Sequence, residues 1–444
     1  MKIAILKYGR EKMGGHSALM SELRHYCDEN QHSMHCYSYT IGGTKRKNYK
    51  FELAENFVFD EFCAEDANQI ANELESFDLL IMLEPATKAG TKEDGRIYTS
   101  IYERVQNPLK WMLSYNIKLG FIKRVRNVLD TIAASDVIST HSENADWAII
   151  GKRAGKPWIK TPLFKRIDEF TDYFNNEDRQ KNILFAGRYE AYKGPQFMIS
   201  VSKILAENGI QCNMIGIDRS PASYHGLLVT EEVTSGRIKV GGPYTMQDGF
   251  KRMSESLFSF APMKLTVDEC SGILEYSQVE GIACGCIPVL HKNSAEFEYR
   301  GVKFGDIPYF AIWFDENNPD ECAKEIVKVA NDKELQKLYK GTALKVLKEM
   351  YSKENLKLTI DAVMNLAKNR CTSEDILKSF DWNEDEIETY KEADSTAYYV
   401  KADIPNLTKR KVNIITGRYG GTTPYVRKWQ PCDYDCGNCS VEKC

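Results

Sequence analysis

Residues 182–194 read NILFAGRYEAYKG, and this stretch indicates how the chain is built. Its apolar start is typical of a buried strand. Residues 194–209, GPQFMISVSKILAENG, then show helical periodicity and end at a glycine, a residue that often terminates helices. A second apolar run, IQCNMIGI at 210–217, follows directly. Strand, helix and strand in this order predict a βαβ unit with parallel strands.

The same alternation extends in both directions along the chain. In the first half the candidate strands are residues 2–7, 77–83, 109–115 and 136–140, and the candidate helices are 16–29 and 64–76. The run FDLLIML at 77–83 is apolar throughout, which suits a parallel strand covered on both faces. In the second half we expect strands in 257–263, 286–290 and 309–315, and helices in 318–331 and 333–352.

Two prolines, Pro157 and Pro162, interrupt the pattern within residues 156–167 and predict a linker there. A chain of 444 residues is also long enough for more than one domain. We therefore predict an α/β fold with two Rossmann-like domains, residues 1–165 and 166–370, and a C-terminal extension at 371–444.

The composition limits the classes of function. The chain is 43% hydrophobic and 27% charged, which is typical of a globular protein, and no apolar run approaches the ~20 residues that cross a bilayer. We therefore expect no membrane partner, and we expect a monomer. The formal net charge is −4, so any contact with DNA has to come from local basic patches.

The extension carries one such basic segment. Residues 409–428 contain six Lys or Arg residues and no Asp or Glu. The basic residues are Lys409, Arg410, Lys411, Arg418, Arg427 and Lys428. Aromatic residues and glycines are interspersed among them, so the segment suggests contact with DNA.

The thirteen cysteines fall into two groups. Nine are scattered, as expected of reduced thiols in the cytosol, and four crowd the end of the chain. The four are Cys432, Cys436, Cys439 and Cys444. Four thiolates this close suit a tetrahedral zinc site, which together with the basic segment would make a small metal-stapled DNA-binding appendage. An iron–sulfur cluster and a disulfide pair are the alternatives.

Arg188 and Lys193 lie past the end of the strand in NILFAG, where the ligands of Rossmann domains bind. The planar donor fork of arginine and the point charge of lysine together suit a diphosphate. A helix beginning near Gly194 and Pro195 would add its positive N-terminal end. The alternative is a solvated loop between a strand and a helix.

A second candidate element is GILEYSQVEGIACGCIPVL at 272–290. It predicts a helix that carries Glu275 and Glu280, ends at a turn around Gly285 and leads into a strand. A carboxylate on such a helix can accept hydrogen bonds from both hydroxyls of a ribose, whereas the alternative is an exposed glutamate on a surface helix. Gly15, in the turn after the first strand, suits either an anion contact by backbone N–H groups or a simple turn.

Together these motifs resemble a known family. G-R-x4-K-G after a strand, followed by a helix with E-G-I-A-C-G-C-I-P-V, is similar to the donor half of the retaining GT-B glycosyltransferases. Five segments in order resemble the DNA α-glucosyltransferases of T-even bacteriophages, which glucosylate 5-hydroxymethylcytosine in duplex DNA. The segments are SDVISTHSENADW (135–147), AGRYEAYKG (186–194), GIDRSPA (216–222), LEYSQVEGIACGCIPV (274–289) and AIWFDEN (311–317).

The resemblance implies a UDP-sugar as the donor substrate and a site that requires no catalytic metal. By this resemblance Arg188 and Lys193 hold the diphosphate, and Glu280 holds the ribose. Further candidates for binding the donor are Gly15, Arg219, Ser220 and Glu275. Arg219 and Ser220 follow the strand at 210–217, from which they could reach the sugar or a phosphate.

The acceptor half departs from the family pattern. Where the family has a His-Asp-His run, ungapped counting places Tyr115, Asn116 and Ile117 in this chain, so either the alignment slips or the acceptor or sugar differs. We assign no catalytic base or nucleophile. The candidate contacts to the acceptor and to DNA are Asn116, Lys118, Lys123, Arg124, Arg126, His141, Lys409, Arg410, Lys411, Arg427 and Lys428. The alternatives are a solvated basic helix around Arg124 and a capped loop at His141.

The resemblance therefore implies transfer of glucose or arabinose from a UDP-sugar to 5-hydroxymethylcytosine or a related base, with retention. The expected location is the cytoplasm of an infected bacterial host. One alternative is a GT-B enzyme that acts on a polysaccharide, lipid or protein. Another is a DNA-binding protein that uses the same scaffold without catalysis.

Overall fold

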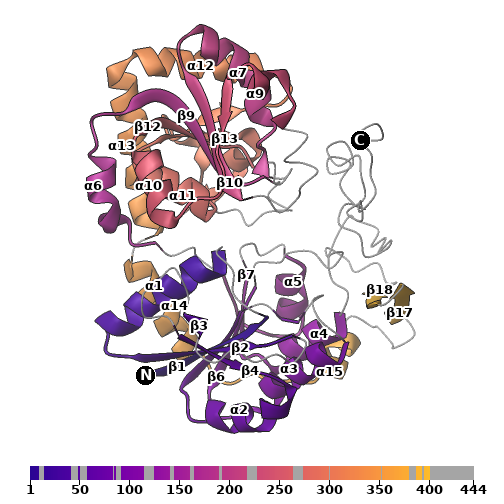
Figure 1. The fold of residues 1–444 in the computed structure, drawn as a ribbon. Coiled ribbons are helices and arrows are strands. Elements are labelled where there is room, and N and C mark those ends of the chain that lie inside the picture. The colour runs from indigo at the N-terminus through magenta and orange to yellow at the C-terminus, as the bar shows by residue number, and fades with distance from the viewer. Residues whose placement is uncertain are drawn as a thin grey trace. The chain divides into compact units, whose positions relative to one another are not determined.

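The computed structural model describes most of the chain up to residue 400. The described residues are 1–9, 15–41, 49–50, 58–83, 85–86, 92–114, 125–140, 145–160, 165–189, 193–217, 228–263, 274–299, 301–351, 353–379, 387–392 and 395–400. The chain forms two compact units (Figure 1). The first contains Met1–Phe164 and the segment that begins at Lys353, and the second contains Lys165–Val267 and Gly272–Ser352.

An eight-stranded sheet forms the centre of the first unit, with strand order β3-β4-β2-β1-β5-β6-β7-β8. All neighbouring strands are parallel except β3 and β4. The strands are β1 (Lys2–Tyr8), β2 (Ser33–Tyr39), β3 (Tyr49–Lys50), β4 (Val58–Phe62), β5 (Leu79–Leu83), β6 (Leu109–Leu113), β7 (Val137–Thr140) and β8 (Trp158–Lys160). The predicted strands of this half are confirmed, and β8 corrects the predicted linker, because Trp158–Lys160 pairs with β7.

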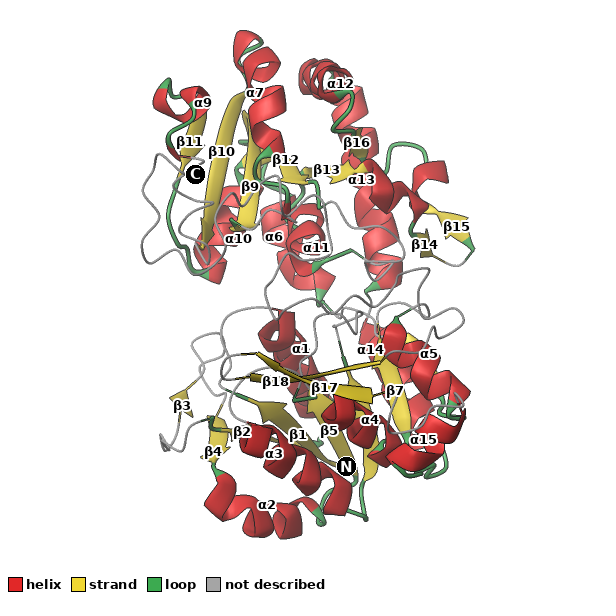
Figure 2. Ribbon diagram, turned by 90° about the vertical axis from the view of Figure 1, so that its right-hand side faces the viewer, coloured by secondary structure: helices red, strands yellow, loops and turns green. Residues whose placement is uncertain are grey.

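Helices cover both faces of this sheet (Figure 2). They are α1 (Gly15–Glu29), α2 (Ala67–Leu74) after the short η1 (Ala64–Asp66), α3 (Lys92–Arg104), α4 (Val125–Ala134), α5 (Asp146–Arg153), α14 (Lys353–Met364) and α15 (Ser373–Ser379). In β5, Leu79 and Ile81 belong to one buried core and Leu80 and Met82 to another. A wholly apolar strand therefore has two covered faces, as its sequence predicts.

Helix α14 packs on the first unit although it follows the second unit in sequence. Its residues Leu356, Ile360 and Val363 are buried in the same core as Ile3 and Leu19. This division differs from the boundary expected at residue 370. The reason is that the apolar stripe of α14 is complementary to the sheet face that α1 also covers. Beyond α15, the described residues form a hairpin of β17 (Ile387–Glu392) and β18 (Ser395–Val400).

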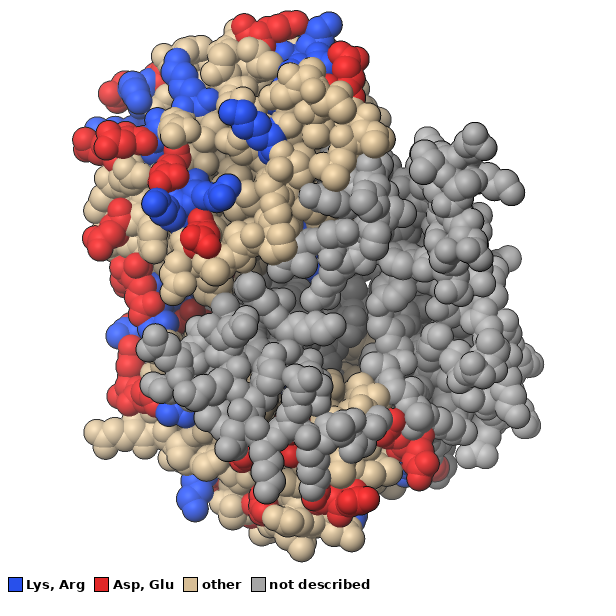
Figure 3. All heavy atoms as spheres, in the orientation of Figure 1, with Lys and Arg blue, Asp and Glu red and all other residues tan. Residues whose placement is uncertain are grey.

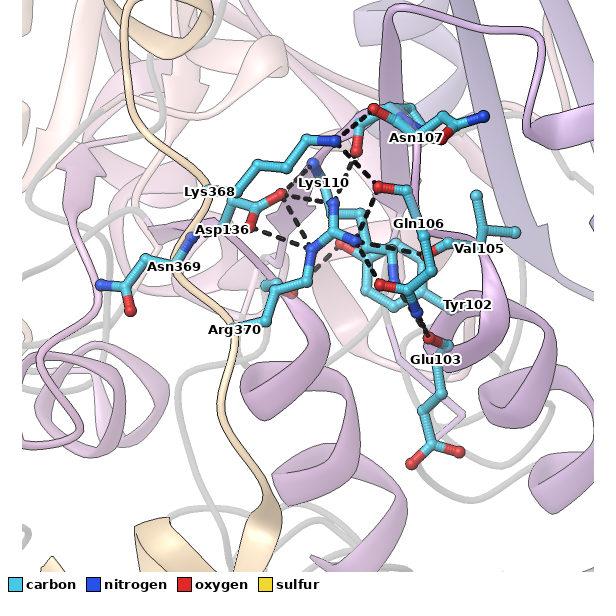
Figure 4. Close-up of polar contacts among 12 residues, drawn as sticks. Tyr102, Glu103, Val105, Gln106, Asn107, Lys110, Asp136, Lys368, Asn369 and Arg370 are labelled. Carbon is cyan, nitrogen blue, oxygen red and sulfur yellow. Dashed lines mark hydrogen bonds and ion pairs between the residues drawn. The ribbon is translucent and has the colours of Figure 1, made fainter.

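The segment that follows α14 is fastened to the first unit by a polar cluster, the clasp, formed by Lys110, Asp136, Lys368, Asn369 and Arg370 (Figure 4). The Arg370 guanidinium donates to the Asp136 carboxylate at 2.9 Å and 3.1 Å. The backbone N–H groups of Lys110 and Asn369 donate to the same carboxylate, each at 2.8 Å. Lys368 donates to two backbone carbonyls of the loop before β6. The clasp therefore fixes the course of the chain toward α15.

The second unit is built on a six-stranded parallel sheet with strand order β11-β10-β9-β12-β13-β16. The strands are β9 (Gln180–Arg188), β10 (Gln211–Ile217), β11 (Ile238–Val240), β12 (Ser256–Ala261), β13 (Ile287–His291) and β16 (Ile312–Phe314). A small antiparallel pair, β14 (Glu298–Tyr299) and β15 (Val302–Lys303), is separate and lies between η5 (Lys292–Glu296) and η6 (Phe304–Asp306). The βαβ unit predicted from residues 182–217 is confirmed.

The helices of the second unit follow the order of the chain. They are η3 (Ile167–Phe170), α6 (Thr171–Phe174), α7 (Phe197–Glu207), α9 (Glu231–Thr234), α10 (Met246–Ser254), α11 (Tyr276–Ala283), α12 (Pro319–Asn331) and α13 (Lys333–Met350). Residues of α7 and α12 share one buried core with the sheet. The crossovers β9-α7-β10 and β12-α11-β13 run in opposite directions, so right-handed connections place α7 and α11 on opposite faces.

The described surface has no strongly polarised face in the view of Figure 3. Basic and acidic side chains are interspersed over the second unit in that view. Within the part of the chain that the structure describes, no helix combines the length and apolar character needed to cross a bilayer.

Candidate functional site

The strand order of the second unit creates one point where the chain reverses its direction of travel across the sheet. From β9 the chain proceeds to β10 and β11, and it then continues on the other side of β9 with β12, β13 and β16. Ligands of open parallel sheets bind beyond the carboxyl ends of the strands at such a switch point. Arg188 is the last residue of β9 and is partly buried, so it lies at this point.

Lys193 is held close to the same point by the glycine that follows it. Gly194 has a φ of +80°, and a Cβ there would lie 2.6 Å from the backbone carbonyl of Pro262, directly after β12. No side chain fits, so the loop after β9 can approach β12 only because residue 194 is glycine. Lys193 Nζ accordingly lies 3.5 Å from the sulfur of Met263. The two cations of G-R-x4-K-G thus both belong to the crevice at the switch point.

Glu275 is the residue immediately before α11 and forms an ion pair with Lys193. Its backbone N–H donates to Gln278 Oε1 at 2.8 Å, which closes the first turn of the helix. Gln278 Nε2 in turn donates to the carbonyl of Ala261, the last residue of β12, at 3.1 Å. Glu275 therefore caps the helix instead of lying within it, and the N-terminus of α11 is tied to the carboxyl end of β12.

Glu280 lies in α11, as the sequence predicts, and its side chain is 17% exposed. Lys165 Nζ lies 3.3 Å from its carboxylate. Burial raises the pKa of the Glu280 carboxyl, and the charge of Lys165 opposes that rise. The surface-glutamate alternative is therefore excluded for Glu280, because a solvated carboxylate would show no such desolvation.

Small residues bring α11 close to the sheet. A Cβ on Gly281 would lie 2.7 Å from Ser259 Oγ on β12, so the helix packs against the strand at this residue. Gly285 has a φ of +82°, and Arg179 Nη2 lies where its side chain would be. That nitrogen also donates to the carbonyl of Cys284 at 2.7 Å and so caps the helix end. The sequence E-G-I-A-C-G thus places Glu280 by close packing.

This arrangement combines two cations near the switch point with a desolvated carboxylate on the adjacent helix. Arginine and lysine in a partly buried crevice can neutralise a diphosphate and stabilise it as a leaving group. A carboxylate with unfilled acceptor positions can bind vicinal hydroxyls. Among the described residues, no cluster of His, Cys, Asp or Glu is arranged to hold a metal ion.

Several predicted site residues fall outside the described residues. In the donor half these are Arg219 and Ser220. In the acceptor half and the extension they are Asn116, Lys118, Lys123, Arg124, His141, Lys409, Arg410, Lys411, Arg427, Lys428 and the four terminal cysteines, Cys432, Cys436, Cys439 and Cys444. Arg126 is in α4, but its side chain is likewise not described, and Gly15 is the first residue of α1. Their roles stay predictions.

One residue of the site was not predicted from the sequence. Lys165 precedes η3, far in sequence from α11, and no motif surrounds it. A lysine within a proline-containing stretch reads as a linker residue, and only the folded chain shows that its side chain is buried beside Glu280.

Two parallel-sheet units of this kind, with a switch-point crevice in the second, define the GT-B class of glycosyltransferase folds. No protein-family model matches the chain. The DNA alpha-glucosyltransferase of Enterobacteria phage T4 is 26% identical to it over 255 residues, which cover 48% of this chain and 62% of that protein. The chain thus spans about three fifths of the length of this curated relative.

Solved structures agree with this class. An alpha-glucosyltransferase in complex with UDP and a 13-mer DNA containing a central A:G mismatch superposes with a TM-score of 0.70 at 19% identity, covering 82% of this chain and 100% of that chain. A structure described as trehalose-6-phosphate from E. coli, bound with UDP-2-fluoro glucose, gives a TM-score of 0.57 at 10% identity, covering 83% and 100%. These likenesses confirm the predicted two-domain α/β fold, and the relative found by sequence confirms the predicted resemblance.

Proposed function

We propose that the chain is a UDP-sugar-dependent glycosyltransferase that modifies a hydroxymethylated cytosine in duplex DNA, with glucose or arabinose as the sugar and with retention. The observation that carries the proposal is the position of Arg188 and Lys193 at the switch point of the second sheet. The sequence relative is by name a DNA alpha-glucosyltransferase, and the structural relatives include complexes with UDP and with DNA containing an HMU base.

In this proposal the second unit binds the donor. Arg188 and Lys193 contact the diphosphate, and the negative charge that develops on the leaving phosphate is stabilised by these fixed cations. Lys193 is paired with Glu275 before the donor binds, so the diphosphate takes over part of an existing ion pair. Glu280 accepts hydrogen bonds from the ribose hydroxyls. Arg219, Ser220 and Gly15 are proposed as further donor contacts.

The first unit is proposed to present the acceptor. Asn116, Lys118, His141 and the basic residues at 123, 124 and 126 would contact DNA. A base inside a duplex is commonly flipped out before an enzyme acts on it. The proposed place of action is the cytoplasm of an infected bacterium.

The test is a panel of reactions. Purified protein is incubated with UDP-glucose or UDP-arabinose and with duplexes that contain cytosine, 5-hydroxycytosine or 5-hydroxymethylcytosine, and the nucleosides are analysed by mass spectrometry. We expect a hexose or pentose adduct on the hydroxymethylated nucleoside alone. Transfer to a glycan, lipid or protein with none to any duplex would replace the DNA proposal with the alternative acceptor class.

The extension is proposed to strengthen DNA binding through its basic segment and a zinc-bound cysteine cluster. Deletion of residues 401–444 should weaken DNA affinity and reduce its dependence on salt, because fewer phosphates are neutralised. The change in slope should be up to about six, one for each basic residue at 409–428. An unchanged slope in a titration by fluorescence anisotropy would refute this role, and metal analysis of the intact protein tests the zinc.

A further inference from the structure

Lys165 has surroundings that distinguish it from a surface lysine. Its side chain is 5% exposed, and its ammonium group lies 3.3 Å from the Glu280 carboxylate. Transfer of a lysine from water into such a place is unfavourable unless the charge is compensated. The position is therefore one that the fold maintains against a cost.

Three aromatic rings from three elements surround the Lys165 ammonium. Its nitrogen lies 5.5 Å from the ring centre of Phe170 in η3, 5.5 Å from that of Phe250 in α10 and 5.8 Å from that of Tyr276 in α11. Phe170 and Phe250 also pack edge to face, with centroids 4.8 Å apart. Ring faces attract a cation within about 6 Å, so this aromatic cage stabilises the ammonium and restricts where it lies.

The Glu280 carboxylate faces a small set of titratable groups. Lys165 is its ion-pair partner, and Tyr244 and Cys284 are close enough for the charge of Glu280 to raise their pKa values further after burial has done so. Neither the phenol nor the thiol supplies a positive charge. Lys165 is thus the group among these that favours the ionised carboxylate.

A carboxylate has about four acceptor positions, and hydroxyl donors bind the ionised form best. Glu280 is neither fully buried nor capped by backbone N–H groups among the described residues, so acceptor positions remain for a ligand. If the carboxylate were protonated, it would become a donor on one oxygen and would bind a diol less well.

We propose that Lys165 is a positioning residue of the donor site, which holds the Glu280 carboxylate in the orientation and charge state that the two ribose hydroxyls require. This inference rests on the proposed function, in which Glu280 binds the ribose. The aromatic cage fixes the ammonium, the ammonium fixes the carboxylate, and the carboxylate selects a ribonucleotide.

The experiment compares UDP with 2′-deoxy-UDP, because the ratio of their dissociation constants isolates the 2′-hydroxyl and cancels the titration of the phosphates. The wild type should prefer UDP by about 10-fold at both pH 6 and pH 8.5, the effect of one hydrogen bond to a charged acceptor. In Lys165→Met, Glu280 loses the charge that opposes its raised pKa. The preference should then fall below about 3-fold near pH 6 and recover toward pH 8.5.

Lys165→Arg is the matched variant, because it keeps the charge. It should retain most of the preference at both pH values, and it also serves if Lys165→Met does not fold. A folded Lys165→Met protein with the wild-type ratio at both pH values would overturn the proposal, as would loss of the preference in Lys165→Arg equal to that in Glu280→Gln. Absence of any preference in the wild type would instead contradict the ribose role of Glu280 itself, so the two failures are distinguishable.

Discussion

The clasp of the first unit and the donor site of the second unit each contain a buried carboxylate paired with a cation, but the two carboxylates differ in how fully they are bonded. Asp136 is fully buried and accepts hydrogen bonds from Arg370 and from the backbone N–H groups of Lys110 and Asn369. Glu280 has Lys165 beside it, and its side chain remains 17% exposed. The first carboxylate has no capacity left for a ligand, whereas the second one has.

The position of each pair in its fold agrees with this difference. Asp136 immediately precedes β7, so the clasp lies at the amino ends of the parallel strands, whereas ligands bind at the carboxyl ends. Arg370 has its guanidinium directed at Asp136 and at the backbone carbonyls of Gln106 and Pro108. A saturated ion pair indicates a structural role, and an unsaturated one near a switch point indicates a binding role.

The largest effect is expected from breaking the saturated pair. Arg370→Met leaves the Asp136 carboxylate buried without its counter-charge and should lower the free energy of unfolding of the first unit by about 3–5 kcal/mol. Hydrogen exchange followed by mass spectrometry on peptides of β6 and β7 measures this loss. Arg24→Met is the control, because the exposed Arg24–Asp28 pair should contribute less than about 1 kcal/mol. Equal effects of the two substitutions would contradict a structural role for the clasp.

The next effect concerns turnover in the second unit. Arg188→Ala should lower kcat/KM for transfer to hydroxymethylated DNA by about 100-fold, because a cation that faces the leaving diphosphate is lost. Arg188→Lys should recover part of the activity, since it restores the charge without the planar fork. Lys181→Ala at the opposite end of β9 is the control and should change kcat/KM by less than about 2-fold. Unchanged turnover in Arg188→Ala would remove Arg188 from the site.

A smaller effect is expected from Lys110, the buried lysine of the clasp. Burial, with the nearby charge of Arg370, lowers the pKa of Lys110 to about 7. The unfolded chain therefore binds more protons than the folded one between about pH 7 and pH 10.5, and the contribution of Lys110 to stability increases as the pH rises through that range. Lys110→Met should lack this gain and should be more stable than the wild type by about 1–2 kcal/mol near pH 6.

Urea unfolding of both proteins at about pH 6 and pH 9 checks the sign of this effect. The difference in the free energy of unfolding between Lys110→Met and the wild type should shrink as the pH rises. A constant difference would show that Lys110 has the same charge in the folded and unfolded chain over this range.

The sequence allowed the sheet-forming strands, the GT-B class and the switch-point position of Arg188 and Lys193 to be predicted, because each depends on local signals. Apolar runs, helical periodicity and glycines at helix ends all lie within a few neighbouring residues. The glycine of G-R-x4-K-G illustrates this, since its contact with Pro262 requires a glycine whatever the rest of the chain does.

Other features could not be predicted because they depend on residues far apart in sequence. Lys165 and Glu280 meet only in the folded unit, and the aromatic cage draws one ring from each of three elements. The clasp joins Asp136 to Arg370, which are 234 residues apart. The strand Trp158–Lys160 was taken as a linker because it is short, borders two prolines and forms by pairing with β7.

The most direct test of the contrast between the two carboxylates is calorimetric titration of UDP into Glu280→Gln and Asp136→Asn, under conditions where circular dichroism shows both variants to be folded. Our account predicts that Glu280→Gln weakens UDP binding by about 10-fold, while Asp136→Asn changes it by less than about 2-fold. Equal dissociation constants for Glu280→Gln and the wild type, or an equal loss of affinity in both variants, would contradict the assignment of Glu280 to the donor site and of Asp136 to the clasp.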